Sequence, residues 1–542
     1  MKTIRLKRNI SALMLILFVM TFLPSIGVAA SYYVDSVAGN DSSPGTVALP
    51  WRTVAKVKGT ALSAGDIVFF KCGGSWNELL YPASGVSGRE VIYDAYGTGN
   101  KPSIRGFYAD NKSYIKVQNI EFKNNSTDIP FLIYNGSHHI SVYNCTITAD
   151  TACTSYSALW LSKNVSYNRI SNCTISHNNI NRQTDVINLR LNANYNVIQN
   201  NTISGATHYC LALEGNTDIY PSYTCNNNII LNNKINAKNG AGIALISGSH
   251  NNVVDGNTVI GGKSTSFDVN LPRSLKVTTK NNIVRRNLIR DNTDPNSSGI
   301  STEVYAYGSY PANVATNNHI YNNTIYNVTK YPLVIATDKS AGAAAYKNYY
   351  KNNAIYGNYY NTYQITIMIH PAIYDNYFTN NLLYSGGSPN VLAVPIGSYY
   401  SVAKIQSTDP THFNNNLQVD PQMDSTLQLQ SGSPCVDSGA FLTTVTSSSG
   451  TGTLFSVADA SYFHDGYGLI AGDTIMVGAE VATISSINYA TNTITLTAPI
   501  SWSKGANVSL PYGGSRPDVG AYESSSTISV SLAPPLNLRV LN

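Results

Sequence analysis

Side chains that can transfer protons are concentrated between about Asn181 and Tyr310, in a chain with only 12% charged residues. Histidine, lysine, arginine and tyrosine can serve as general acids or bases when a fold positions them. This stretch therefore predicts a site of proton-transfer chemistry. The candidates for catalysis are Arg190, His208, Tyr209, Lys263, Arg273 and Lys276.

Four carboxylates in the same stretch suggest two further kinds of chemistry. Calcium is a hard cation that prefers oxygen ligands, so these residues are candidate metal ligands. Two carboxyl groups at a suitable separation can also share general acid and general base roles. The four residues are Asp185, Glu214, Asp268 and Glu303.

Aromatic and polar residues near these groups could hold a ligand. We expect the substrate-binding set to be Trp160, Arg182, Asn188, Asn270, Tyr305 and Tyr307. Simpler roles are open for several candidates. Arg190 and Glu214 could form a cross-strand ion pair, His208 could cap a turn, and Trp160 and Tyr305 could pack beneath a loop.

A sequence repeat must position these side chains. Near-copies of the stretch NYNVIQNNTI recur, each with an apolar residue, two variable residues, Asn or Cys, one variable residue and an apolar residue. The Asn or Cys position spans 236 residues in eight steps, a mean period of 29.5 residues. This period is typical of a solenoid. The position falls at Cys145, Cys173, Asn201, Asn233, Asn257, Asn287, Asn323, Asn353 and Asn381.

The repeat predicts strands, because its apolar residues alternate within short runs and lack helical spacing. Three runs fit in each period, which predicts an all-β, single-stranded parallel β-helix with three strands per coil. Asparagine tolerates the left-handed backbone angles of a sharp bend. Buried there, its amide could bond to the next coil and form a ladder, with Cys145 and Cys173 as small residues in the same position.

Strand alternation then predicts which side chains point outward. If Ile187 and Leu189 face the core, Asn188 and Arg190 face outward. The same reasoning places Glu214 outward. Insertions in a solenoid crowd one side and often wall a binding groove, so we expect the site on this face.

The pattern resembles right-handed parallel β-helix proteins of the pectate-lyase-like superfamily, including members with NosD-type repeats, from about Ser31 to Glu523. The segments YYVDSVAGNDSSPGT and AGDIVFFKCGGSWNE resemble the first strand, capping helix and first coil of such proteins. The segments SGSPCVDSGA and GGSRPDVGAYE resemble two halves of their terminal motif, separated by an alternating block. We expect a signal peptide at 1–30, an N-terminal cap and first coils at 31–110, the β-helix at 111–440, a small inserted β domain at 441–512, and a return strand and tail at 513–542.

The N-terminal thirty residues predict export. A basic start precedes the apolar run ISALMLILFVMTFL, and VAA ends at Ala30, where a signal peptidase would cleave. Without that segment the chain has 31 basic and 30 acidic residues, and no basic tract indicates nucleic acid. We expect a secreted or cell-surface monomer without stable membrane insertion. Its seven cysteines leave at least one unpaired, and Cys210 and Cys225 are close enough in sequence to pair.

The resemblance implies a carbohydrate-active protein, first of all a polysaccharide lyase that cleaves a uronate-containing polysaccharide by β-elimination. Relatives use Lys or Arg as the base and Arg or Ca²⁺ to neutralise the uronate, so calcium is an expected cofactor. A glycoside hydrolase with paired carboxylates is an alternative, because Asp185 with Glu214, or Asp268 with Glu303, lie on adjacent coils. Glu214 and Glu303 are about 14 Å apart, too far to act as a pair. A non-catalytic glycan-binding or surface protein is the third possibility.

Overall fold

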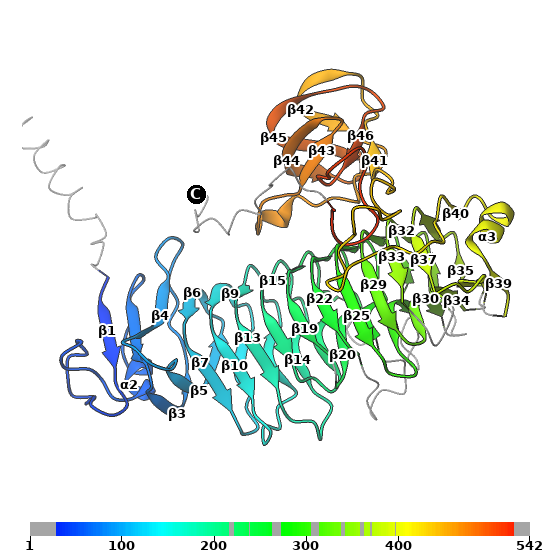
Figure 1. The fold of residues 1–542 in the computed structure, drawn as a ribbon. Coiled ribbons are helices and arrows are strands. Elements are labelled where there is room, and N and C mark those ends of the chain that lie inside the picture. Colours follow the sequence, from blue (N-terminus) through cyan, green and yellow to red (C-terminus); the bar gives the residue numbers. More distant parts are fainter. Residues whose placement is uncertain are drawn as a thin grey trace, which may run out of the picture.

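A computed structural model describes most of the chain as an elongated parallel solenoid with a small β domain on one side (Figure 1). The described residues are 29–215, 222–237, 239–262, 273–304, 314–337, 342–357, 363–368, 371–395 and 397–524. The expected signal peptide lies almost wholly outside these ranges. Within them, no helix has the length and apolar character needed to cross a bilayer.

The solenoid is built from two large parallel sheets, and we call the 14-stranded one sheet I. Its strands are β1 (Ser31–Val34), β2 (Ile67–Lys71), β4 (Val91–Tyr96), β6 (Ser113–Gln118), β9 (His138–Tyr143), β12 (Arg169–Ser171), β15 (Val197–Gln199), β18 (Ile229–Leu231), β21 (Val253–Asp255), β24 (Ile283–Arg285), β28 (His319–Tyr321), β32 (Tyr349–Lys351), β36 (Tyr377–Thr379) and β40 (Phe413–Asn414).

The second sheet, with 23 strands, consists of two rows that meet at β5, and we call them rows IIa and IIb. Row IIa contains β3 (Ser75–Leu80), β5 (Ser103–Asp110), β8 (Phe131–Tyr134), β11 (Ser157–Ser162), β14 (Asp185–Arg190), β17 (Tyr209–Glu214), β20 (Ala241–Ile246), β23 (Arg273–Val277), β26 (Ser298–Val304), β30 (Tyr331–Thr337), β34 (Ile365–Ile367), β38 (Leu392–Ala393) and β39 (Tyr399–Tyr400). Row IIb contains β7 (Glu121–Asn124), β10 (Thr146–Ala149), β13 (Thr174–His177), β16 (Thr202–Ser204), β19 (Lys234–Asn236), β22 (Thr258–Ile260), β25 (Leu288–Asn292), β29 (Thr324–Val328), β33 (Ala354–Tyr356) and β37 (Leu382–Tyr384).

Short elements complete the shaft. A third parallel sheet contains β27 (Val314–Thr316), β31 (Ala344–Tyr346) and β35 (Ile373–Tyr374). Helix α2 (Val54–Lys58) lies near the β1 end and α3 (Val402–Thr408) near the β40 end (Figure 1). Thr53 caps α2 by accepting a hydrogen bond from the backbone of Lys56, and Val54 and Val57 bury the helix against the core.

Stacked apolar side chains fill the shaft between the sheets. In sheet I, Ile198 pairs with Ile230 and Ile230 with Val254, and all three belong to the main core. Each fully buried aliphatic side chain contributes about 1.5–3 kcal/mol. Because every coil repeats the same inward positions, the core is continuous along the shaft.

The predicted asparagine ladder is confirmed. The Asn201 backbone N–H and side-chain amide both donate to Oδ1 of Asn233, each at 3.0 Å. The column continues through every predicted Asn from Asn201 to Asn381 and extends one coil further, to Asn416. Cys145 and Cys173 hold the same position, and Cys173 donates its backbone N–H to Asn201.

A second asparagine ladder, which the sequence analysis missed, runs beside the first. Asn196 donates its backbone N–H to Oδ1 of Asn228 at 2.9 Å, and the column contains Asn168, Asn196, Asn228, Asn252, Asn282, Asn318, Asn348 and Asn376. Each member lies five residues before a member of the first ladder. The sequence analysis expected a left-handed backbone angle at each ladder asparagine. The structure instead places that angle on the residue before each ladder position, as at Tyr195 and Asn200.

The cysteines are all free thiols, so the suggested pairing of Cys210 with Cys225 is wrong. The Cys210 thiol faces the carbonyl of Asn236, whereas the Cys225 thiol faces that of Leu189. Burial raises the pKa of both thiols to about 12, so they stay protonated in the core.

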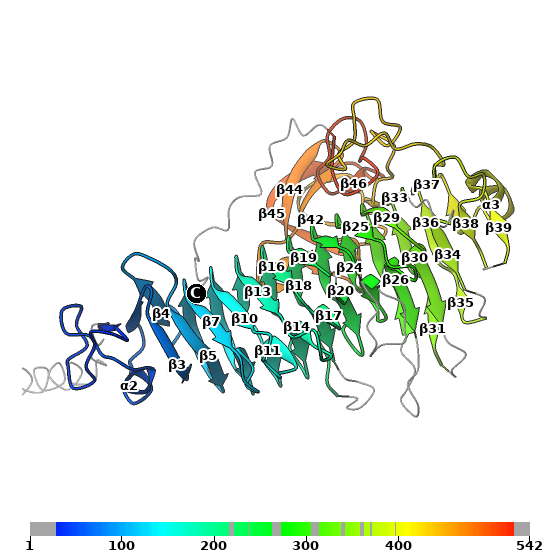
Figure 2. The same cartoon turned by 60° about the horizontal axis from the view of Figure 1, so that its bottom comes forward.

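A six-stranded antiparallel sheet forms the β domain (residues 443–509), which packs against the outer face of sheet I (Figures 1 and 2). Outward residues of sheet I, including Val197, Ile229, Val253 and Ile283, share one apolar cluster with the domain. Its elements are β41 (Thr443–Thr444), β42 (Gly450–Ser456), the 3₁₀ turn η1 (Gly466–Gly468), β43 (Thr474–Val477), β44 (Glu480–Asn488), β45 (Thr493–Trp502) and β46 (Asn507–Ser509).

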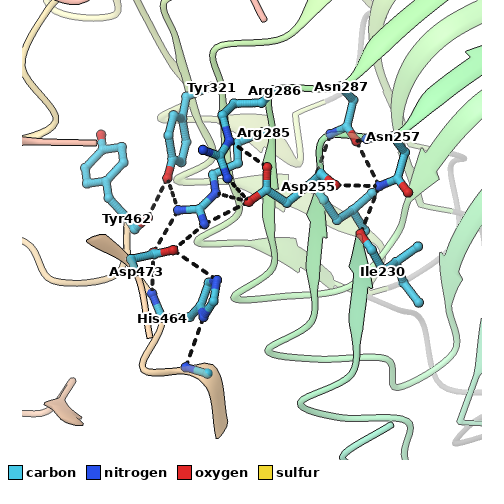
Figure 3. Close-up of polar contacts among 12 residues, drawn as sticks. Ile230, Asp255, Asn257, Arg285, Arg286, Asn287, Tyr321, Tyr462, His464 and Asp473 are labelled. Carbon is cyan, nitrogen blue, oxygen red and sulfur yellow. Dashed lines mark hydrogen bonds and ion pairs between the residues drawn. The ribbon is translucent and has the colours of Figure 1, made fainter. Parts of the chain in front are cut away.

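A buried ionic network joins the domain to the shaft (Figure 3). Arg285 on β24 donates to both carboxylate oxygens of Asp473, at 2.8 and 2.5 Å, and to Asp255 at 2.9 Å. Tyr321 and His464 complete the network. Although burial opposes ionisation of Asp473, the charges of Arg285 and His464 hold its pKa far below the ordinary value. The ions therefore remain charged and paired across the interface.

We predict that Asn257→Ala destabilises the shaft. The change removes the oxygen that accepts two hydrogen bonds from Asn233. Since each buried group left without a partner costs about 1–3 kcal/mol, the free energy of unfolding should fall by about 2–4 kcal/mol. Chemical denaturation would measure it. Asn257→Cys, which copies the ladder position of Cys173, should cost less, and Asn390→Ala at an exposed site is the control. Equal losses in all three variants would contradict the ladder's role.

A second prediction concerns Lys351, whose ammonium group donates to the carbonyl of Leu442 at 3.1 Å. Burial lowers the pKa of Lys351 to about 8, although Asp459 opposes this. The unfolded chain then binds more protons than the folded one between about pH 8 and the ordinary lysine value near 10.4, so stability gains a contribution as pH rises through this window. Thermal unfolding of Lys351→Met should lack that gain relative to the unaltered protein. Parallel pH profiles for the two proteins would refute the prediction.

Candidate functional site

The candidate site lies on the outer face of row IIa, on strands β11, β14 and β17. Ile187 and Leu189 belong to the main core, so the residues between and after them, Asn188 and Arg190, face outward as predicted. Parallel register aligns Trp160 with Asn188 and Arg190 with Glu214. Three neighbouring coils therefore present their polar side chains in line.

A carboxylate–imidazole pair forms the centre of the site. His208 Nδ1 lies 2.9 Å from Oδ1 of Asp185, which also accepts the backbone N–H of Tyr209 at 3.0 Å. The other Asp185 oxygen accepts from the Asn188 amide at 2.6 Å. The carboxylate therefore assigns the His208 proton to Nδ1 and leaves Nε2 with a free lone pair, the arrangement of a general base.

Tyr156 supplies a hydroxyl group beside this pair, 3.4 Å from His208 Nδ1. Burial raises the pKa of Tyr156 well above its ordinary value, and the charges of Asp185 and Glu214 raise it further. The phenol is therefore a protonated donor at neutral pH. Sequence analysis missed Tyr156. Its position next to the start of β11 could have indicated it, because Asp185 begins the next strand of the row, β14. The Tyr156 carbonyl accepts the Asp185 backbone N–H at 2.9 Å.

Arg190 and Glu214 form an ion pair at 3.2 Å, with side chains 23% and 21% exposed. This is the cross-strand pair that the sequence left open as a simpler role. The guanidinium is partly accessible at the edge of the site. It lies at the end of β14, five residues along the strand from Asp185.

Several buried polar atoms on β11 and β14 lack a hydrogen-bond partner among the described residues. They are the Trp160 indole N–H, the Asn188 amide oxygen and the hydroxyl groups of Ser157 and Ser162. A buried polar group without a partner costs free energy.

The remaining predicted site residues divide into three groups. Arg182 is exposed ahead of β14. Tyr209 is buried in an outer apolar cluster with Ala212 and Ala244, and the centroid of its ring lies 4.0 Å from that of His208. Lys276 on β23 and Glu303 on β26 are buried further along row IIa. Lys276 is three strands from β14, about 14 Å, so it does not join the Asp185 cluster. Arg273 begins β23 and pairs with Ser298. Outside the described residues lie Lys263, Asp268, Asn270, Tyr305 and Tyr307.

The three predicted calcium ligands that the structure describes, Asp185, Glu214 and Glu303, are not brought together. Both Asp185 oxygens accept protein hydrogen bonds, Glu214 pairs with Arg190, and Glu303 lies three strands from Glu214. Nowhere in the described ranges do three or more His, Cys, Asp or Glu residues form a group that could hold a metal ion.

Comparison with known families identifies the architecture. Residues 105–279 match a family model described as "Right handed beta helix region", and the solenoid has about 10 turns. The chain is a right-handed parallel β-helix. The expected all-β class and parallel β-helix are thereby confirmed. A search of curated proteins finds no match.

Among solved structures, this β-helix is similar to several at low identity. An XylC complex with xylose is 12% identical with a TM-score of 0.47, and the match covers 88% of this chain and 99% of that one. The PL6 polysaccharide lyase Pedsa3628 from Pseudopedobacter saltans is 14% identical with a TM-score of 0.46, covering 70% and 96%. The GH136 lacto-N-biosidase from Eubacterium ramulus is 14% identical with a TM-score of 0.40, covering 72% and 66%.

We predict that Asp185→Asn changes the His208 tautomer without unfolding the β-helix. The amide keeps the shape of the carboxylate but can donate to Nδ1, so the ring proton should move to Nε2. Nitrogen chemical shifts of the imidazole would report the change. Asp409→Asn, next to His412, is the matched control and should leave His208 unaltered. An Nδ1-protonated ring in both variants would show that Asp185 does not set the tautomer.

Proposed function

We propose that this protein is a secreted carbohydrate-active enzyme that cleaves a uronate-containing polysaccharide by β-elimination at the Asp185–His208–Tyr156 cluster. The observation that supports it best is the juxtaposition of a base and a protonated donor. His208 is oriented by Asp185 at 2.9 Å, and the Tyr156 hydroxyl lies 3.4 Å from the same ring. β-Elimination needs one group of each kind, with a cation for the uronate.

In the proposed reaction, His208 Nε2 removes the proton from C5 of the uronate. The C5–H electrons form the C4–C5 double bond as the C4–O4 bond breaks, and Tyr156 donates its hydroxyl proton to O4. Release of the Nε2 proton to solvent and uptake of a proton by the phenolate then restore both residues. Arg182, exposed three residues before Asp185, and Arg190, partly exposed five residues after it, are the cations that could offset the charge that develops on the uronate carboxylate.

Asp185 would act by holding His208 and would not touch the substrate, because its carboxylate is buried and its oxygens are occupied. It is therefore a positioning residue.

Hydrolysis by paired carboxylates has less support. An inverting hydrolase needs two carboxyl groups about 6.5–9.5 Å apart that both face the glycosidic bond. Asp185 is 1% exposed, and Glu214 is engaged by Arg190. The other predicted pair includes Asp268, which lies outside the described residues.

The decisive experiment is incubation with polygalacturonate and alginate. We expect ultraviolet absorbance from the new C4–C5 double bond. His208→Ala and Tyr156→Phe should each reduce the rate by about 10²–10⁴-fold, the usual contribution of a general acid or base. Tyr374→Phe, an exposed tyrosine outside row IIa, is the matched control and should keep full activity.

Other outcomes would reject the proposal in different ways. New reducing ends without the absorbance would indicate a hydrolase. Glycan binding with neither signal would indicate a non-catalytic binding protein. Full activity in both His208→Ala and Tyr156→Phe would remove this cluster from the mechanism.

A further inference from the structure

A hollow lies at the corner of the shaft where row IIa turns toward sheet I. It has a volume of about 400 Å³, within the range of about 300–1,000 Å³ usual for small-molecule sites. The turns that follow β11 and β14 line it, so it begins two residues beyond Arg190. Its lining residues are Asn164, Ser166, Tyr167, Asn192, Asn194 and Tyr195.

Stacked rings fix the aromatic wall of the hollow. Tyr167 stacks on His139 at 5.1 Å between ring centroids and on Tyr195 at 5.4 Å, and Tyr114 extends the column beyond His139 at 4.8 Å. All four residues have left-handed backbone angles, with φ between 55° and 57°. Tyr167 is nevertheless 43% exposed, so its edge and hydroxyl face solvent. Rings held in this way lose little freedom when a ligand binds.

The hollow offers hydrogen-bonding groups without charge. The Asn192 amide donates to Asn164 Oδ1 at 2.9 Å, and Asn194 Oδ1 accepts from the backbone of Asn226 at 2.6 Å. These bonds orient the amides and leave the Asn164 and Asn194 NH₂ groups without a partner among the described residues. The hydroxyl groups of Ser166, Tyr167 and Tyr195 are likewise uncommitted there. The wall thus presents two amide donors and three groups that donate or accept.

We propose that this corner hollow binds a neutral sugar residue of a glycan. Uncharged amides and hydroxyls match the hydroxyl groups and ring oxygen of a sugar, whereas none of the six lining side chains could neutralise a carboxylate or phosphate. The inference does not depend on β-elimination. If the proposed reaction occurs, the hollow is a binding subsite beyond the Arg190 end of the catalytic cluster.

The test is calorimetric titration with neutral hexasaccharides of β-1,4-linked glucose, xylose and mannose. The full chain carrying His208→Ala would be used, so that binding is measured without turnover. At least one glycan should bind, with an affinity unchanged between 0.05 and 0.5 M salt, because no ionic contact is screened. Tyr167→Asn, which keeps a residue tolerant of the left-handed backbone, should weaken binding by at least tenfold.

Tyr114→Asn is the matched control, since it makes the same change in the same stacked column but outside the hollow. It should bind as tightly as the parent. Ser166→Ala removes a single hydroxyl and should weaken binding severalfold, which keeps the test valid if Tyr167→Asn fails to fold. The inference is overturned if no neutral glycan binds, if folded Tyr167→Asn binds as tightly as Tyr114→Asn, or if salt abolishes binding. Loss of binding in Tyr167→Asn, with lyase activity retained when the same change is made in the chain with His208 intact, would separate the hollow from the catalytic cluster.

Discussion

Two columns of buried asparagine amides hold this molecule in register. Where one asparagine follows another, its amide oxygen accepts a backbone N–H and a side-chain N–H from the preceding coil, as Asn233 and Asn257 do for their neighbours. A coil that slipped by one residue would lose both columns and turn its apolar side chains outward. The amides therefore determine which side chains of row IIa line up on the surface. The alignment of Trp160 with Asn188, and of Arg190 with Glu214, follows from this constraint.

The candidate site also depends on where the strands begin. Asp185 starts β14, and His208 immediately precedes β17, while Val186 and Cys210 enter the core. The turns therefore set the directions of the side chains at the start of these strands, Asp185 and His208. Regular alternation sets the directions of the side chains further along each strand. This arrangement lets a buried carboxylate hold an imidazole from the next coil. The chemistry sits at the junction between turn and strand, where the backbone still has freedom to aim a side chain.

The regular part of the fold could be predicted from the sequence because every coil repeats one set of constraints. The first ladder was visible as a recurring Asn or Cys, and the second as an Asn five residues earlier in most of the same copies. Tyr156 could not be recognised because it lies in the turn before β11, where strand alternation does not fix the direction of a side chain, although the contact with His208 spans only 52 residues. The pairing of Asp473 with Arg285 could not be inferred, since the two residues are 188 positions apart and Asp473 lies outside the repeat.

The docked β domain has a mechanical consequence. A solenoid normally transmits force only between adjacent turns, so its coils can peel away one after another. Here the β domain contacts the outer surface of sheet I from Arg169 to Tyr321 and is anchored through Arg285. Coils within that span must separate from the brace before they can unravel, so they should yield together under load. Among the residues that the structure describes, the coils before β12 have no contact of this kind with the β domain, so we expect those coils to unfold one after another.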